Sequence, residues 1–141
     1  MICIINGPNL NLLGKREPEI YGHLSFADIL KNIRNKFPEI PIEYFQSNCE
    51  GEIIDKIHEL GYDNLECKGI VINPGAYAHY SYAIADAIRS VTLPVVEVHI
   101  SNIHSREEFR RNSVTAEACK GIISGLGAKG YELAIDYLKS L

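Results

Sequence analysis

Short runs of aliphatic and β-branched residues, separated by segments with helical spacing, constrain this chain more than any other feature. The strand-like runs lie at residues 2–5, 41–46, 69–73, 95–101 and 120–124. Short, nearly continuous apolar runs are typical of parallel strands that are covered on both faces. Apolar residues recur at helical spacing between these runs, so strands and helices alternate along the chain.

This alternation predicts an α/β fold, a three-layer sandwich with a five-stranded parallel sheet. Right-handed crossovers with one reversal of winding favour the flavodoxin-like strand order 2-1-3-4-5. The chain has 141 residues, which suits one domain, and it contains no internal repeat, low-complexity segment or linker. We therefore expect one flavodoxin-like domain over residues 1–141.

Capping signals predict where several helices begin and end. Ser25, followed three residues later by Asp28, predicts the start of a helix that Pro38 ends. Gly61 predicts the C-terminal stop of a second helix over residues 48–60. The segment Ser105-Arg106-Glu107-Glu108 predicts a capped helical turn after the fourth strand.

Composition excludes several classes of protein. A net charge of -4 argues against a nucleic-acid binder, and no apolar run is long enough to span a membrane. The first six residues have no basic flank, so we expect no secretory signal. The four cysteines show neither metal-type spacing nor a dense disulfide pattern, which predicts reduced thiols in a cytoplasmic protein.

The run Val95–Ser101 carries polar residues inside an otherwise buried strand. Glu97 and His99 are two positions apart and therefore project from the same face. A carboxylate beside an imidazole can fix its tautomer, although the two can also form a buried pair with no catalytic role. Ligands of open parallel sheets collect beyond the carboxyl ends of the strands, where His99 and Ser101 fall.

Three further motifs are weak. The glycines of residues 125–130 fit a dinucleotide-binding pattern, but the chain has no later strand with the acidic residue that holds the ribose, so we expect a tight turn and close packing instead. His99 and His104 lack further residues at a metal-ligand spacing. Ser81 lacks the glycine-flanked elbow of a hydrolase nucleophile.

Amide, basic and hydroxyl side chains follow the first, third and fourth predicted strands. Each one alone has an ordinary interpretation as a turn residue, a loop aromatic or a solvated cation. Together they predict a site at one sheet edge, and they are Asn9, Arg16 and Tyr21, then Asn73, Gly75 and His79, then His99, Ile100, Ser101, Arg106 and Arg110.

The strings that carry these residues resemble type II 3-dehydroquinate dehydratase from the first strand to the final helix. They are residues 6–14, Arg16-Glu17-Pro18, Tyr21-Gly22, Gln46-Ser47-Asn48, Asn73-Pro74-Gly75-Ala76, residues 97–102 and residues 106–110. The resemblance implies a flavodoxin-like subunit that dehydrates 3-dehydroquinate to 3-dehydroshikimate by anti elimination through an enolate, without metal or organic cofactor. It also implies a dodecamer built from trimers, acting in the shikimate pathway of aromatic amino acid biosynthesis or in quinate catabolism.

The resemblance further implies a role for each site residue. Tyr21 is the proton acceptor, His99 the proton donor and Arg16 the transition-state stabiliser. Asn9 positions a water near the enolate. The chemistry of the residues themselves, apart from the resemblance, predicts that Glu97 holds His99. The substrate-binding residues are Asn73, His79, Ile100, Ser101, Arg110 and Asp86, of which Asp86 reaches a neighbouring subunit's site. Apart from the resemblance, we expect Arg106 and Gly75 to support the site, because a tyrosine that acts as a base needs cations beside it and Gly75 follows the third strand.

The chain departs from the family pattern at Cys49, Ala78 and Tyr80, which affects loop packing and affinity more than proton transfer. Three alternatives remain open. A flavodoxin-like module could bind a small ligand without catalysis, and a non-catalytic assembly protein could use the same scaffold. The dehydration could also proceed through a lysine Schiff base, although the lysines fall mostly on helix exteriors and strand starts.

Overall fold

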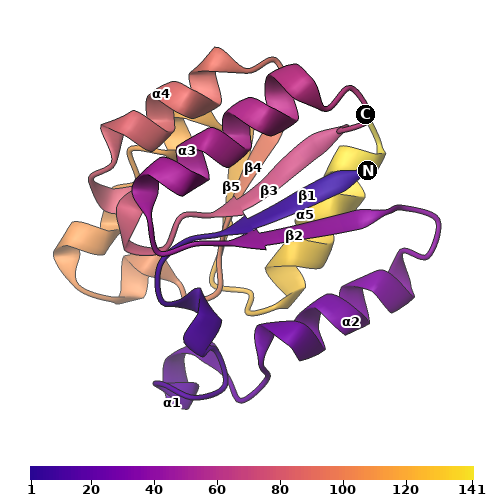
Figure 1. Ribbon diagram of the computed structural model, residues 1–141. Coiled ribbons are helices and arrows are strands. Elements are labelled where there is room, and N and C mark those ends of the chain that lie inside the picture. Colours follow the sequence, from indigo (N-terminus) through magenta and orange to yellow (C-terminus); the bar gives the residue numbers. More distant parts are fainter.

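A computed structural model describes residues 1–141 and contains one parallel sheet flanked by helices (Figure 1). Its strands are β1 (Ile2–Asn6), β2 (Ile42–Gln46), β3 (Gly69–Asn73), β4 (Val95–His99) and β5 (Gly121–Ser124). The five strands lie in the order β2-β1-β3-β4-β5 and every pairing is parallel. This confirms the predicted α/β fold and the flavodoxin-like strand order.

Helices cover both faces of the sheet, α2 (Phe26–Lys36) and α5 (Lys129–Lys139) on one face and α3 (Glu50–His58) and α4 (Tyr82–Ser90) on the other (Figure 1). Alternate residues of β1 enter the two apolar layers. Ile2 and Ile4 pack with α2 and α5, whereas Cys3 and Ile5 pack with α3 and α4. Because both faces are covered, every residue of β1, β3 and β4 is buried.

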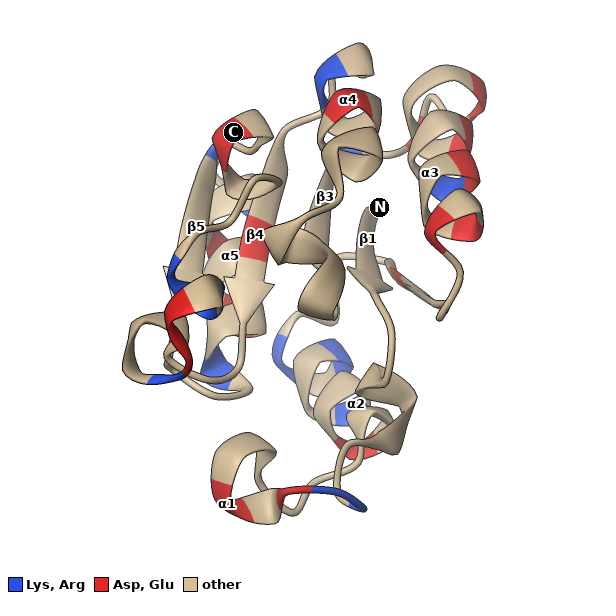
Figure 2. Ribbon diagram, turned by 90° about the vertical axis from the view of Figure 1, so that its left-hand side faces the viewer, with Lys and Arg blue, Asp and Glu red and all other residues tan.

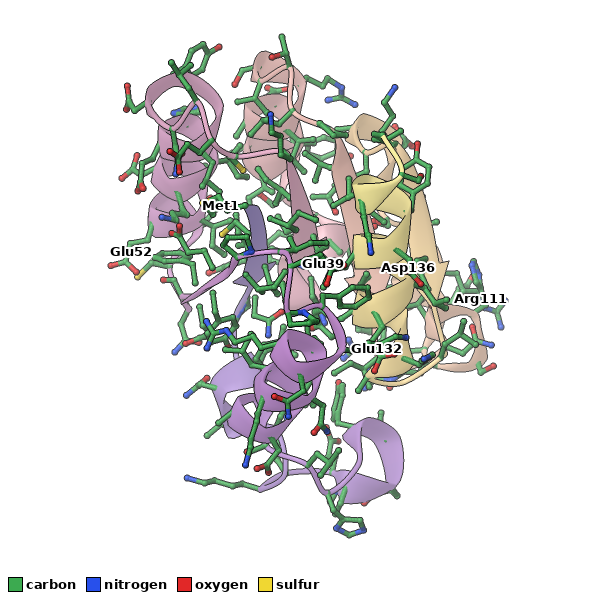
Figure 3. The ribbon with its side chains drawn as sticks, turned by 90° about the vertical axis from the view of Figure 1, so that its right-hand side faces the viewer. Met1, Glu39, Glu52, Arg111, Glu132 and Asp136 are labelled. Atoms are coloured by element: carbon green, nitrogen blue, oxygen red, sulfur yellow. The ribbon has the colours of Figure 1, made fainter.

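Two ion pairs connect the end of α2 to α5 at the surface shown in Figure 3, where Glu132 lies on α5 and Glu39 lies beside it. Lys36 Nζ is 2.6 Å from Glu132 Oε2, and Lys139 pairs with Glu39. Ion pairs between side chains that water reaches contribute little to stability. The apolar contacts of α2 and α5 with the sheet therefore hold this layer in place.

The start of α2 agrees with its predicted cap. The Ser25 hydroxyl accepts a hydrogen bond from the Asp28 backbone N–H, and Asp28 Oδ2 accepts one from the Ser25 backbone N–H. This reciprocal arrangement satisfies two donors that a helix start otherwise leaves free. The helix ends at Lys36. The next residue, Phe37, precedes Pro38, and a proline disfavours helical backbone angles in the residue before it.

The predicted helix stop at Gly61 was wrong. The chain continues beyond α3 into a π-helical turn, Glu59–Asp63, and Gly61 lies inside that turn without a left-handed backbone. A Cβ at Gly61 would lie 2.2 Å from Val91 Cγ1. Glycine is needed here because the end of this helix approaches the segment after α4, and not because a cap requires it.

The predicted cap at Ser105 was also wrong. The capped turn begins at Asn102, whose Oδ1 accepts from the His104 backbone N–H, and Ser105 ends this 3-10 turn. A second 3-10 turn follows at Glu108–Arg111. The side-chain oxygen of an asparagine, like that of a serine, can accept a hydrogen bond from the backbone N–H two residues later. Asn102 therefore provides the cap in place of Ser105.

The glycines of residues 125–130 make the turn and the close packing that the sequence predicted. Gly125 has a φ of 88°, and a Cβ at Gly130 would lie 3.0 Å from Val98 Cγ1, where α5 packs on β4. The long loop after β1 contains a 3-10 turn, Leu10–Leu12, and the short helix α1 (Pro18–Tyr21). None of the helices combines the length and the apolar character that crossing a membrane requires.

Candidate active site

A cavity of about 130 Å³ lies at the carboxyl ends of β1, β3 and β4, where the sequence predicted a site. The predicted residues that line it are Asn9, Arg16, Tyr21, Asn73, Gly75, His79, His99, Ile100, Ser101, Arg106 and Arg110. The remaining lining residues are Pro8, Leu10, Leu13, Ala76 and Ile103. Three loops that are far apart in the sequence therefore meet around one cavity.

The loop that carries Tyr21 has unusual backbone angles. Asn9 and Glu17 adopt left-handed conformations, with φ values of 68° and 42°, although neither is glycine. Glu17 directly precedes α1, and Pro18 occupies the first turn of that helix, where its fixed φ suits helical backbone. Left-handed non-glycine residues store backbone strain that often accompanies function, and here they lie on either side of Arg16.

Two arginines surround the side chain of Tyr21. Arg106 Nη1 donates to the Tyr21 hydroxyl oxygen at 2.8 Å and lies 3.3 Å from Ser101 Oγ. The Arg16 guanidinium lies 5.5 Å from the centre of the Tyr21 ring, while its Nη2 pairs with Glu17 Oε2 at 3.0 Å. A guanidinium that donates to the phenol oxygen can stabilise negative charge that develops there during a reaction.

Strand β4 places a carboxylate and an imidazole beneath the cavity, and Figure 2 shows an acidic segment within this strand. Glu97 is fully buried and His99 is 6% exposed. Glu97 Oε2 lies 3.5 Å from His99 Nε2, which is enclosed and makes no hydrogen bond. A carboxylate at this distance can orient the imidazole towards the cavity.

Two hydroxyl side chains that the sequence analysis missed hold Glu97. Ser113 Oγ donates to Glu97 Oε2 at 2.7 Å, and Thr115 Oγ1 donates to Glu97 Oε1. Neither residue lines the cavity. The available signal was that a carboxylate inside a buried strand requires hydrogen-bond donors, although the sequence alone does not say which segment supplies them.

His79 lies next to His99, with the ring centres 6.2 Å apart and the ring planes 24° from parallel. Burial lowers the pKa of His79, and the nearby His99 and Arg110 lower it further, whereas a hydrogen bond to Asn112 opposes the shift. Nδ1 of His79 donates to the Asn112 carbonyl oxygen at 2.9 Å. The neutral imidazole therefore keeps Nε2 as an acceptor, which can receive a ligand hydroxyl.

Asn73 is fixed at the floor of the cavity. Its Oδ1 accepts from the Gly75 backbone N–H at 3.1 Å, and its Nδ2 donates to the Tyr131 hydroxyl at 2.9 Å. Tyr131 in turn donates to Asn6 Oδ1 at 2.9 Å, and burial raises its pKa, so it remains a neutral donor. One amide hydrogen of Asn73 is left for a ligand.

The backbone N–H groups of Ile100 and Ser101 are free. Neither donates to any acceptor in the chain, while the Ile100 and Ser101 carbonyl oxygens accept from Gly127 N and Ser124 Oγ. Both residues line the cavity beside Asn73. Two free backbone donors next to a side-chain amide suit the oxygens of a carboxylate.

Asp86 does not reach this cavity. It lies on α4 with an 80% exposed side chain, 3.3 Å from Arg89 Nη1. Among the positions that depart from the family pattern, Ala78 is buried and its carbonyl accepts from Val114 N at 2.8 Å, whereas Tyr80 and Cys49 are exposed. No lysine lines the cavity, so an amine for a Schiff base is missing from its walls.

The sequence is similar to that of a known protein family over nearly its whole length. The family model described as dehydroquinase class II matches residues 1–139. The chain is 57% identical to a 3-dehydroquinate dehydratase of Thermotoga petrophila, over 98% of this chain and 94% of the relative. It is 58% identical to a 3-dehydroquinate dehydratase of Caldicellulosiruptor bescii, over 99% of this chain and 97% of the relative.

Solved structures give the same result for the fold. The type II dehydroquinase of Butyrivibrio crossotus superposes with a TM-score of 0.94 at 52% identity, covering 98% of this chain and 96% of that one. The type II dehydroquinase of Propionibacterium acnes gives a TM-score of 0.93 at 43% identity, covering 99% of this chain and 96% of that one. The similarity therefore extends over the whole sheet and its loops.

Proposed function

The chain belongs to the class II dehydroquinase family, so it catalyses the loss of water from 3-dehydroquinate to give 3-dehydroshikimate, and we propose that Tyr21 and His99 carry the two proton transfers. The reaction is a step of the shikimate pathway. One observation carries this assignment of roles. The Tyr21 hydroxyl, the guanidinium that contacts it and the His99 imidazole all line one cavity.

Tyr21 is the base of the proposed mechanism. A proton next to a ketone is weakly acidic, and a phenolate is a much stronger base than a carboxylate. A free phenol ionises in only about 0.1% of molecules at neutral pH, which corresponds to a cost of about 4 kcal/mol. A cation about 4 Å away at an effective dielectric of about 20 returns an energy of that order. Arg106 supplies this cation at the oxygen, and Arg16 adds a second charge at the ring.

The enolate forms when Tyr21 has taken the proton. Asn9 lines the cavity, and its backbone N–H donates to Asn48 Oδ1 at 3.0 Å. Its side-chain amide has no partner in the chain. This amide positions a water that donates to the enolate oxygen. Donors placed in advance stabilise such a charge without reorganising during the reaction.

His99 completes the elimination. The enolate re-forms its ketone, a carbon–carbon double bond develops, and the carbon–oxygen bond to the hydroxyl breaks. His99 gives its proton to the departing oxygen, which leaves as water. The charge of Glu97, 3.5 Å from Nε2, stabilises the imidazolium before this transfer.

The substrate carboxylate binds to Asn73 and to the free backbone N–H groups of Ile100 and Ser101. His79, neutral because burial lowers its pKa, accepts a hydrogen bond from a substrate hydroxyl through Nε2. Arg110 supplies a further positive charge at the rim of the cavity, and Gly75 supports Asn73 through its backbone N–H. These contacts fix the substrate between base and acid.

The alternatives explain less of the cavity. A binding module needs no phenol in contact with a guanidinium, and it needs no imidazole next to a buried carboxylate. A Schiff-base route needs a lysine, and none lines the cavity. The geometry therefore favours the enolate route.

Assembly and location extend the proposal. Residues 1–141 act as one catalytic domain, and the chains form a dodecamer built from trimers in which Asp86 contributes to a neighbouring subunit's site. This role is supported by the side chain of Asp86, which is 80% exposed and does not line the cavity of its own chain. The four cysteines are free thiols, which supports a cytoplasmic location.

The test of this function is direct turnover. Purified protein is mixed with 3-dehydroquinate, and the ultraviolet absorbance of the conjugated product is followed with time. A steady rise that depends on protein concentration is the expected result. Absence of product over a range of pH values, with the protein folded and assembled, would refute the assignment.

A further inference from the structure

We propose that Thr115, acting together with Ser113, is a positioning residue for the proton donor, because its hydroxyl holds the buried Glu97 carboxylate ionised and facing His99. The proposal rests on the role of His99 given above. Thr115 does not line the cavity and touches no reacting atom. It acts on the reaction only through Glu97.

The hydroxyls of Ser113 and Thr115 donate hydrogen bonds to different oxygens of the Glu97 carboxylate. Ser113 donates to Oε2 and Thr115 donates to Oε1, while Oε2 also lies 3.5 Å from His99 Nε2. Glu97 and Thr115 are both fully buried and Ser113 is 9% exposed, so water does not replace either donor. A buried carboxylate with both oxygens bonded is fixed in orientation and is stabilised in its charged form.

The segment that carries the two hydroxyls is itself fixed in place. Val114 N donates to the Ala78 carbonyl oxygen at 2.8 Å, and Ala118 N donates to the Thr115 carbonyl oxygen at 3.0 Å. Ser113 Oγ also accepts a hydrogen bond from the Ala116 backbone N–H at 3.1 Å. Thr115 Oγ1 has no backbone partner, and besides Glu97 it contacts Ser113 Oγ at 3.2 Å, so replacing it acts on this carboxylate and its two hydroxyls and leaves the backbone bonds of the segment in place.

Three titratable groups interact with Glu97. His99 lies beside it on β4, His79 approaches from the turn after β3, and Cys119 precedes β5. Burial raises the pKa of Cys119 and the charge of Glu97 raises it further, so this thiol stays neutral. His99, whose Nε2 lies 3.5 Å from Glu97 Oε2, is therefore the group whose proton donation responds to Thr115.

Loss of the Thr115 hydroxyl makes the ionised carboxylate less favourable. Glu97 then takes up a proton more readily, and because a neutral carboxylic acid does not stabilise an imidazolium, a smaller fraction of the enzyme holds His99 in the form that donates. Turnover falls while substrate affinity is retained, because Thr115 does not contact the substrate. The acidic limb of the pH–rate profile moves to higher pH, since Glu97 takes up a proton more readily.

The experiment compares Thr115→Val, which keeps the shape and removes the donor, with Thr115→Ser, which keeps the donor. We expect Thr115→Val to lower kcat about 10- to 100-fold, the size of one hydrogen bond to a charged group, with KM close to wild type. Thr115→Ser should return most of that loss. Thr92→Val makes the same substitution at an exposed position outside the site and serves as the control.

A second background tests whether Thr115 acts through His99. In His99→Ala the donor is already missing, so adding Thr115→Val should cause no further loss of turnover. An equal loss in both backgrounds, or a Thr115→Val enzyme with wild-type kcat and pH profile, would overturn the proposal. If Thr115→Val does not fold, Thr115→Cys replaces it, and its weak donor should give an intermediate kcat.

Failure of the proposed function is distinguishable from failure of this inference. Absence of turnover by the wild-type protein refutes the function, whatever Thr115 does. The imidazole of His99 can be titrated by NMR in the wild type and in Thr115→Val without any substrate. A changed titration curve supports the positioning role, and identical curves refute it.

Discussion

The guanidinium of Arg106 donates a hydrogen bond to the hydroxyl oxygen of Tyr21 at 2.8 Å, although the two residues are 85 positions apart in the sequence. Arg16 is much nearer to Tyr21 in the sequence, yet its guanidinium lies over the ring and pairs with Glu17. The cation at the reacting oxygen therefore comes from the loop after β4. Arg106 thus has a larger share in activating Tyr21 than the sequence indicated.

Replacing Arg106 tests this share. We expect Arg106→Gln to lower kcat about 100-fold, because it removes a charge-assisted hydrogen bond to the phenolate. The loss should be smaller at high pH, where hydroxide helps to ionise Tyr21. Steady-state rates across pH measure the effect, and Arg111→Gln, at an exposed position that does not line the cavity, is the control. A wild-type rate for Arg106→Gln at neutral pH would remove Arg106 from this role.

Tyr21→Phe separates the base from the ring. The variant keeps most of the packing, so the fold should survive while turnover falls by several orders of magnitude. Tyr137→Phe changes an exposed tyrosine of α5 and should leave turnover unchanged. Borohydride added during turnover should leave the wild-type enzyme active, because no imine forms. A lysine adduct seen by mass spectrometry would establish the Schiff-base route instead.

His99→Ala removes the acid. We expect it to bind a substrate-like acid while losing most of its turnover, because the departing hydroxyl then has no proton donor. Calorimetric binding of the acid and the steady-state rate are measured on the same preparation. His58→Ala, on the exposed side of α3, is the control. Near-normal turnover in His99→Ala would show that another group protonates the leaving oxygen.

Asp86 links assembly to activity. We expect Asp86→Asn to weaken turnover although its own cavity is unchanged, whereas Asp136→Asn, exposed on α5, should not. Chains with Asp86→Asn and chains with Tyr21→Phe are then unfolded together and reassembled. Some mixed sites regain both side chains, so the mixture should be more active than either variant alone. Failure to complement, or a fully active monomer in light scattering, would argue against a shared site.

His79 gives a pH dependence of stability. Burial lowers its pKa in the folded state, so the unfolded chain binds a proton that the folded chain does not. The free energy of unfolding should therefore fall as the pH drops below about 6.5, the ordinary pKa of histidine, and it should keep falling until the pH passes the lower pKa of His79 in the folded state. His79→Gln should reduce this slope in denaturant titrations, while His104→Gln, at an exposed position, should keep it. Equal slopes in the wild type and His79→Gln would contradict the shift.

The layered fold and the sheet edge that carries the site can be predicted from the amino-acid sequence alone. Strands β1, β3 and β4 are buried on both faces. Such strands need nearly continuous apolar residues, and these runs can be recognised in the sequence without any tertiary information. The period of a strand also places Glu97 and His99 on one face, as the structure confirms with its 3.5 Å separation. These features depend on local chemistry alone.

Which distant side chains meet depends on the packing of the folded chain. The side chains of Arg106, Ser113 and Thr115 belong to residue types that are common on protein surfaces, and nothing local marks which of them face Tyr21 or Glu97. Gly61 likewise has the local pattern of a helix stop, and only the close approach of Val91 explains the glycine. In each case the partner lies far along the chain, and only the packing of loops and helices onto the sheet sets the distance between them.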